Sequence, residues 1–182
     1  MTRRAGTANR ASFDPQPTLA GDLLHLRPLR ADDFEALFRV ASDPRIWEQH
    51  PEPERCQEPV FRKFFRDALY SGGALVAVHA ATGEIIGSSR YHGYDAEKSV
   101  VEIGWTFLAR AYWGGRYNGE MKRLMLDHAF QSVDRVIFVI GSDNLRSRRA
   151  VEKIGAAFTG ETVDAAGRER VVYELTRARS RT

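Results

Sequence analysis

The sequence predicts a mixed α/β domain in which one central sheet carries helices on both faces. Three observations support this prediction. Stretches with the alternating or continuous apolar pattern of strands are interspersed with stretches whose apolar residues recur at helical spacing. The order along the chain is strand, two helices, three strands, helix, strand, helix and two strands. No internal repeat or linker divides the 182 residues, which are enough for one sizeable core.

The first part of the chain supplies one strand and two helices. Residues 23–29 alternate in polarity and predict a strand. Asp32 suits the N-cap of a helix whose apolar stripe ends at Ala41. Segment 46–53 is irregular and aromatic, which suits a pocket wall, and Pro59 then opens a second helix.

Strands dominate the rest of the chain. A short turn at 81–83 indicates a hairpin, and Gly155 suits the end of a helix. The predicted elements are, in order, strands at 74–80, 84–91 and 99–108, a helix through 121–128, a strand at 135–140, a helix at 144–154, and strands at 157–163 and 171–175.

Composition bounds the class of protein. We expect a flexible tail at 1–20, one domain at 21–177 and a short basic tail at 178–182. No apolar run is long enough to cross a bilayer, so no membrane partner is expected. The single cysteine, Cys56, suits a reducing cytoplasm. The net charge of +3 and the few arginines of the basic tail do not predict nucleic-acid binding.

A glycine-containing loop at 113–120 (Trp-Gly-Gly-Arg-Tyr-Asn-Gly-Glu) lies between a predicted strand and a predicted helix. Such a loop leaves backbone amides unpaired and pointing one way, and the helix dipole adds partial positive charge. The loop therefore suits a phosphorylated ligand, although its glycines are equally compatible with a simple tight turn. No lysine followed by serine or threonine comes after the glycines, so this is not a Walker-type nucleotide loop.

Four short motifs occur in a characteristic order. They are Leu26-Arg27-Pro28-Leu29, Glu102-Ile103-Gly104-Trp105, Trp113-Gly114 through Asn118, and Asn144-Leu145-Arg146-Ser147 through Glu152-Lys153-Ile154-Gly155-Ala156. In this order they resemble the GNAT N-acetyltransferase family, most closely the branch of ribosomal-protein N-terminal acetyltransferases of the RimJ/RimL kind. The resemblance covers most of 22–176 and implies the GNAT fold. Arg116 departs from the family, which usually has glycine or alanine there, but the backbone donors survive this change.

The resemblance implies acetyl-CoA as the acyl donor. The diphosphate of the donor would bind the amides of the glycine loop, and its pantetheine arm would pair with the backbone of a strand edge at Phe107 and Leu108. The side chain of Asn144 would bond to the same arm. The implied cofactor-binding residues are Phe107, Leu108, Gly114, Gly115, Arg116, Tyr117, Asn118, Gly119, Asn144 and Ser147.

Two catalytic residues follow from the resemblance, which implies direct attack of an amine without an acyl-enzyme. Glu102 is the candidate base because burial beside the cofactor would raise its pKa, although a structural glutamate is equally compatible. Glu161 and Asp164 are alternative bases. Many relatives use a tyrosine as the general acid at the position where this chain has Val151, so Ser147 becomes the candidate acid. The alternative is that the Ser147 hydroxyl is structural and bonds to a backbone carbonyl of its helix.

The acceptor is expected to be a primary amine: a protein N-terminus, an amino acid or a small amine. Aromatic and imidazole side chains are candidates for its pocket, namely Trp47, His50, Tyr91 and Tyr94. No two histidines have metal-ligand spacing, so no metal is expected. Dimers are common among such enzymes, which makes a homodimer one expected assembly. The alternative function is a non-catalytic acyl-CoA-binding sensor or interaction module on the same fold.

Overall fold

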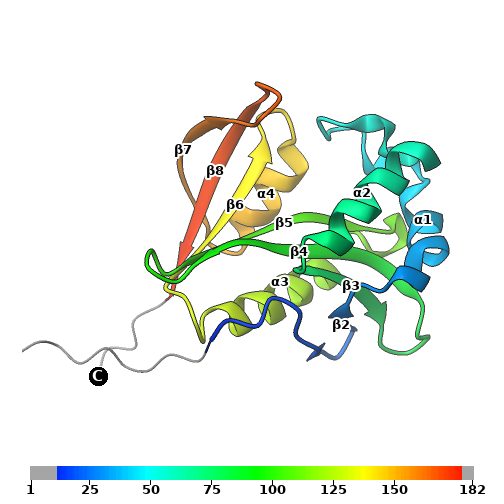
Figure 1. The fold of residues 1–182 in the computed structure, drawn as a ribbon, viewed down its shortest axis with the longest axis horizontal. Helices are drawn as coiled ribbons and strands as arrows, with labels where there is room; N and C mark the ends of the chain where they lie inside the picture. Colours follow the sequence, from blue (N-terminus) through cyan, green and yellow to red (C-terminus); the bar gives the residue numbers. More distant parts are fainter. Residues whose placement is uncertain (1–11, 178–182) are drawn as a thin grey trace, which may run out of the picture.

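One mixed sheet organises the protein, and its helices cover both faces (Figure 1). The computed structural model describes residues 12–177, so residues 1–11 of the predicted N-terminal tail and the whole predicted C-terminal tail, 178–182, lie outside the described residues. The sheet has 8 strands in the order β1-β2-β3-β4-β5-β6-β8-β7. Helices α1 and α2 lie on one face, and α3 and α4 lie on the other. The predicted mixed α/β fold is confirmed.

The elements follow the predicted order. The strands are β1 (Leu19–Ala20), β2 (Leu24–Pro28), β3 (Ala74–His79), β4 (Ile85–Asp95), β5 (Val100–Leu108), β6 (Arg135–Gly141), β7 (Ala157–Val163) and β8 (Glu169–Thr176). The helices are α1 (Phe34–Ala41), α2 (Glu58–Tyr70), α3 (Arg116–Ala129) and α4 (Leu145–Lys153). No helix among the described residues is long and apolar enough to span a membrane.

Two cores form because each helix turns one apolar stripe towards the sheet. On the α1–α2 face, Phe61, Phe64 and Phe65 of α2 pack against Phe107 of β5. On the α3 face, the buried side chains of α3, such as Met125, pack under the central strands. The sheet therefore holds its central strands between two apolar layers.

The segment 12–20 packs on the domain, where the sequence analysis expected a tail. Phe13 stacks on Tyr94 with ring centroids 4.9 Å apart, and β1 pairs with β2. The carboxylate of Glu120 accepts hydrogen bonds from the backbone amides of residues 22–24, at 2.8 to 3.0 Å. Phe13 thus anchors this segment, and the Glu120 carboxylate holds the residues that follow it against α3.

Strands β5 and β6 separate halfway along their length, and this opening positions the site. They pair in parallel only from Val100 and Arg135 to Glu102 and Ile137. Beyond that point β5 continues beside β4, and β6 continues beside β8. At Trp105, φ is +52°, and the register of β4 and β5 shifts nearby, as in a β-bulge. We call the space beyond Glu102 the β5–β6 opening.

Candidate active site

The glycine loop presents free backbone donors at the start of α3. Gly114 and Gly115 have φ values of +103° and +106°, which other residues rarely adopt, and Gly115 is the N-cap. Among residues 12–177, no acceptor receives a hydrogen bond from the amides of Gly114 to Asn118. The Gly119 amide donates to the Gly115 carbonyl oxygen at 2.7 Å. The prediction that the Gly119 amide donates a hydrogen bond to the diphosphate is therefore wrong, because this fourth helical amide bonds back to the N-cap carbonyl.

The electrostatics of this helix terminus favour an anion. The first turn of α3 contains no acidic residue, although carboxylates are the usual complement to the positive end of a helix dipole. Arg116 instead adds an exposed positive side chain there. The Tyr117 hydroxyl lies 3.0 Å from Nε2 of His79, which ties the helix start to β3. A bound anion would compensate the positive charge that the protein leaves uncompensated at this end.

The predicted strand contact at Phe107 and Leu108 is partly occupied by protein. The Phe107 side chain is buried in the α1–α2 core. The Leu108 carbonyl oxygen already accepts a hydrogen bond from Nε1 of Trp113 at 2.9 Å. The guanidinium of Arg146 lies 4.3 Å from the centre of the Trp113 ring. The Leu108 carbonyl is therefore not a free acceptor for a cofactor arm, and any pairing with β5 falls closer to the opening.

Asn144 and Ser147 face each other at the start of α4. Asn144 is 7% exposed, and its Oδ1 caps the helix by accepting from the Ser147 amide at 3.1 Å. The Asn144 side-chain amide group and the Ser147 hydroxyl have no hydrogen-bond partner among the described residues. Capping therefore fixes the Asn144 carbonyl and leaves its NH₂ group available, while Ser147 keeps a free hydroxyl. The neighbouring Arg148 is held by the Tyr173 hydroxyl and the Ser142 carbonyl.

Glu102 is the last residue of β5 that pairs with β6, and it is half-buried. Its carboxyl group forms no hydrogen bond or ion pair with any residue in the described part of the chain. Burial raises the pKa of Glu102 to about 7, against the partial opposing effect of Arg90 and Arg170. Asp164, an alternative base, is hydrogen-bonded by Arg168 and Arg170, which hold its pKa well below the usual range.

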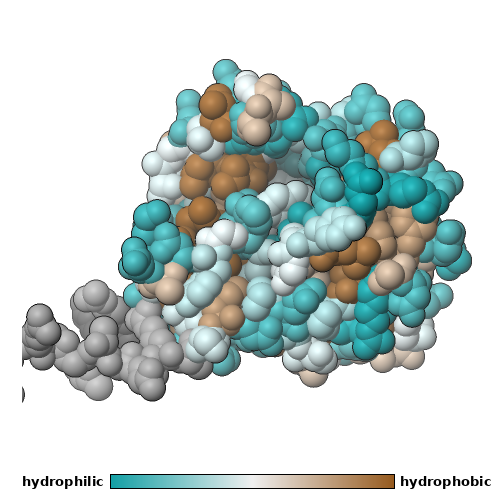
Figure 2. Space-filling model, in the orientation of Figure 1, coloured by the Kyte–Doolittle hydropathy of each residue, from teal (hydrophilic) through white to brown (hydrophobic). Residues whose placement is uncertain are grey.

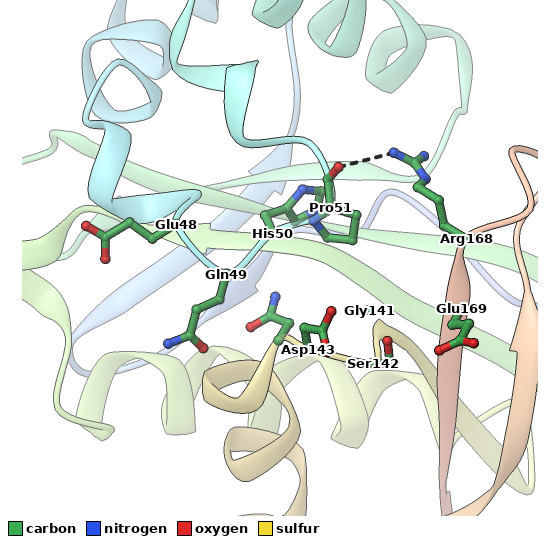
Figure 3. A pocket seen from close by; sticks show the side chains of 10 residues that line it. Glu48, Gln49, His50, Pro51, Gly141, Ser142, Asp143, Arg168 and Glu169 are labelled. Atoms are coloured by element: carbon green, nitrogen blue, oxygen red, sulfur yellow. Dashed lines mark hydrogen bonds between the residues drawn. The ribbon is translucent and has the colours of Figure 1, made fainter.

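A cavity of about 470 Å³ lies at the end of β6 (Figure 3). It is lined by the loop at 48–51, by residues 141–144 and by Arg168 and Glu169. Figure 3 shows Arg168 reaching across to the Pro51 carbonyl, a contact of 3.4 Å. Figure 2 shows apolar residues gathered over β6 and β8 beside a hollow in the surface. The cavity is thus lined by loop segments and by the terminal residues of β6 and β8, most of them polar.

Of the predicted acceptor residues, only His50 lines this cavity. Its Nδ1 accepts from the Glu52 amide at 3.0 Å, and its Nε2 lies 3.0 Å from NH1 of Arg55. Burial and the nearby arginines lower the pKa of His50 to about 3, so its ring is neutral at pH 7. His50 can therefore shape the pocket but cannot carry charge to it.

The other three predicted acceptor residues lie elsewhere. Trp47 is 3% exposed, and its Nε1 donates to the Ala41 carbonyl, so it is a core residue. Tyr91 is 2% exposed and points to the α3 face, where its hydroxyl donates to the Met125 carbonyl. Tyr94 stacks on Phe13, which also contacts His128 in the last turn of α3. That end of α3 is about 20 Å from the glycine loop.

Sequence reasoning missed two residues, Arg90 and Trp105, on the face of the sheet that carries Glu102. Arg90 and His92 of β4 pair with Gly104 and Glu102, and the Trp105 ring lies against both of them. The signal was present in the strand alternation, because Ser88, Arg90 and His92 share one face while Ser89 and Tyr91 share the other. No group of three or more His, Cys, Asp or Glu side chains in the described chain is placed to hold a metal ion.

Comparisons with solved structures agree with this architecture. A GNAT-family protein from Chromobacterium violaceum ATCC 12472 is 23% identical with a TM-score of 0.82, and the match covers 97% of this chain and 94% of that chain. A GCN5-related N-acetyltransferase from Brucella melitensis is 20% identical with a TM-score of 0.77, covering 88% and 79%. RimJ from Mycobacterium smegmatis, in complex with CoA-disulfide, is 20% identical with a TM-score of 0.65, covering 87% and 84%. At these identities the likeness concerns the fold.

The sequence itself identifies the family. No curated protein matches the chain. The family described as "Acetyltransferase (GNAT) domain" matches residues 24–157, which is well over half of the 182 residues and includes the glycine loop, Glu102 and α4. The chain therefore belongs to the GNAT acetyltransferase family.

Proposed function

We propose that the protein transfers an acetyl group from acetyl-CoA to a primary amine by direct attack. One observation carries this proposal. The β5–β6 opening has the unpaired amides of residues 114–118 near one end and the unpaired, half-buried carboxyl group of Glu102 at the other. The first group of donors suits a diphosphate, and the second suits a base that works near neutral pH.

The chain offers three kinds of donor to acetyl-CoA, which this family uses. The amides of residues 114–118 would hold the diphosphate, with Arg116 adding charge. The free NH₂ group of Asn144 would donate to a carbonyl of the pantetheine arm, since its Oδ1 is already used in capping. The edge of β5 beyond Glu102 has no strand on its β6 side and can pair with an extended polyamide.

The proposed reaction needs one base and one acid. The amine nitrogen bonds to the thioester carbon, the carbon–sulfur bond breaks, and the sulfur leaves as a thiolate. Glu102, directly or through a water molecule, takes the proton that the amine loses, because a pKa of about 7 leaves the carboxylate substantially ionised at neutral pH. The free hydroxyl of Ser147 is the proposed proton donor to the leaving sulfur, and a solvent water molecule returns a proton to the serine oxygen. No acyl-enzyme is formed.

The rival function is acyl-CoA binding without turnover. Many relatives carry a tyrosine at the position of Val151. Val151 lies on α4, is 4% exposed in the hydrophobic core, and its side chain cannot act as a general acid. Saturable binding of acetyl-CoA without CoA release, unchanged by Glu102→Gln, would favour this rival. The RimJ/RimL branch, with a protein N-terminus as acceptor, also stays a proposal; support comes from the motifs and from a fold shared with RimJ. A homodimer and a cytoplasmic location stay predictions.

The decisive experiment combines calorimetry with a thiol-release assay. We expect purified protein to bind acetyl-CoA and to release CoA thiol with at least one member of a panel of amines that includes ribosomal-protein N-terminal peptides. Glu102→Gln should bind acetyl-CoA as well as the parent protein but lose turnover. The matched control is Glu97→Gln, because Glu97 is an exposed carboxylate in the β4–β5 turn. Binding without turnover of any amine would refute the proposal.

A further inference from the structure

Arg90 is a buried cation without a hydrogen-bond partner among residues 12–177. It lies in the middle of β4 and is 6% exposed. Its Nε is fully buried with no partner, and no other atom of its side chain forms a hydrogen bond or ion pair with the described residues. The guanidinium lies 4.6 Å from the centre of the Trp105 ring and 5.6 Å from that of Phe64. The two aromatic rings offset part of the free-energy cost of burying the charged guanidinium, but they accept no hydrogen bonds from its in-plane N–H groups.

The neighbouring charges do not supply the missing partner. Arg55 bonds to Glu52 and His50, while Arg168 and Arg170 share Asp164. These groups therefore satisfy one another. Around Arg90, Arg55 adds positive charge, and Asp67 and Glu102 interact with it only at longer range. Burial beside another cation lowers the pKa of Arg90 to about 10, and no carboxylate of residues 12–177 forms a hydrogen bond or ion pair with the guanidinium.

Arg90 and Glu102 lie on the same face of the sheet with an open position between them. Arg90 pairs with Gly104, and Glu102 is two residues away on the same strand, so the two are diagonal neighbours about 7–8 Å apart at the backbone. A Cβ added to Gly104 would lie 3.2 Å from Oε1 of Glu102, so that carboxyl group lies over the glycine; apart from it and the adjacent residues, no atom of the described chain lies within 4 Å of this position. A molecule above Gly104 can therefore reach Glu102 with one end and Arg90 with the other.

We propose that the acceptor carries an anionic group a few bonds from its amine, as an amino acid does, and that this group pairs with Arg90 while the amine faces Glu102. The inference rests on the proposed function and specifies the acceptor class for the same site. The planar guanidinium fork suits a carboxylate, which accepts two parallel hydrogen bonds. Arg90 is thereby a specificity-determining residue, and Gly104 provides the space above the strand.

Matched acceptors test this assignment. Glycine with glycinamide, and β-alanine with β-alaninamide, differ in the negative charge, and kcat/KM is compared per unprotonated amine because the amine of each amide has the lower pKa. We expect the parent protein to prefer the acid in each pair by about tenfold or more in kcat/KM, the effect of one charged hydrogen-bonded contact. Arg90→Met should abolish this preference, mainly through KM for the acid, while keeping turnover of the amide. Arg90→Lys should keep part of the preference, since it retains charge without the fork.

The control variant is Arg66→Met, because Arg66 is an exposed arginine of α2 outside the site and should leave the preference unchanged. Equal use of acid and amide by the parent protein would overturn the inference. So would an Arg90→Met variant that loses both substrates in the same proportion, because Arg90 would then act through Glu102. If acetyl-CoA binds but no amine, neutral or anionic, is turned over, the proposed function fails. Calorimetric titration of acid and amide onto the CoA-loaded parent and Arg90→Met proteins would then test Arg90 directly.

Discussion

Replacing Glu102 with glutamine separates its chemistry from its shape. The change keeps the size of the side chain and removes the group whose pKa burial raises to about 7. For a carboxyl group with that pKa, the ionised fraction rises from about one tenth at pH 6 to about nine tenths at pH 8, so the base-dependent kcat/KM of the parent protein should rise about ninefold over this range. Glu102→Gln should abolish this rise.

The expected loss of activity is large, and the expected change in stability has the opposite sign. A general base contributes about 10²- to 10⁴-fold, which corresponds to about 3–5 kcal/mol in the activation free energy. In the folded protein the pKa of Glu102 lies above its unfolded value, so ionisation destabilises the fold as pH rises from about 4.5 to 7. Glutamine carries no such charge and should raise the free energy of unfolding by up to about 3 kcal/mol at pH 8, with little effect at pH 4.

The assay measures kcat/KM by thiol release from pH 5.5 to 9 with two acceptors whose amines differ in pKa. An inflection that both acceptors share belongs to the enzyme, and one that moves belongs to the amine. Urea denaturation at pH 4 and pH 8 gives the stability change, and Glu97→Gln serves as control. Activity within threefold of the parent, or an unchanged inflection in Glu102→Gln, would refute the role of Glu102.

Four further substitutions test other parts of the structure. Gly115→Ala should weaken CoA binding about tenfold or more by calorimetry, because a side chain is strained at the φ of +106° of this residue. Gly119→Ala should leave CoA binding unchanged and stabilise the helix by about 0.5–1 kcal/mol. Equal effects of the two substitutions on CoA binding would contradict this. Glu120→Ala should lower the free energy of unfolding by about 1–3 kcal/mol in urea denaturation at pH 7, because the amides of residues 22–24 lose their acceptor. The difference from the parent protein should shrink in acid, where the carboxyl group of the parent is protonated. An unchanged denaturation midpoint at pH 7 would contradict this. Burial lowers the pKa of Lys122 to about 7, so protonation of this lysine destabilises the fold at pH values below the pKa that the lysine has in the unfolded chain. Lys122→Met should therefore raise the melting temperature at pH 6 and have less effect at pH 10. A lower melting temperature of the variant at pH 6 would contradict this.

The sequence predicted the fold through the periods of its apolar residues, which packing on two faces of one sheet requires. The helix stripe at Phe61, Phe64 and Phe65 and the buried run around Phe138 both lie where the pattern placed them. The segment 12–20 was missed because its attachment depends on partners far along the chain. Phe13 contacts residues of β4 and α3, and no local pattern announces such contacts.

The candidate site was predictable where backbone chemistry decides it. Glycines before a helix predict free amides, but only the structure shows that the Gly119 amide is already bonded. Residue type alone did not predict which of the acceptor candidates lie together. Tyr91 was chosen as an aromatic, yet strand alternation turns it to the α3 face and turns Arg90 towards Glu102. The positive φ of Trp105 shifts the register locally, and no sequence pattern signals a bulge at a tryptophan.

The central claim is that the free amides at the start of α3 hold the diphosphate of CoA. The most direct measurement follows the backbone amide resonances of isotope-labelled protein during titration with CoA and, separately, with pantetheine, which lacks the diphosphate. We expect CoA to shift the amides of residues 114–118 and slow their exchange with solvent, to change Gly119 much less, and pantetheine to leave all of them unchanged. Saturable CoA binding that leaves the amides of 114–118 unperturbed would contradict the claim.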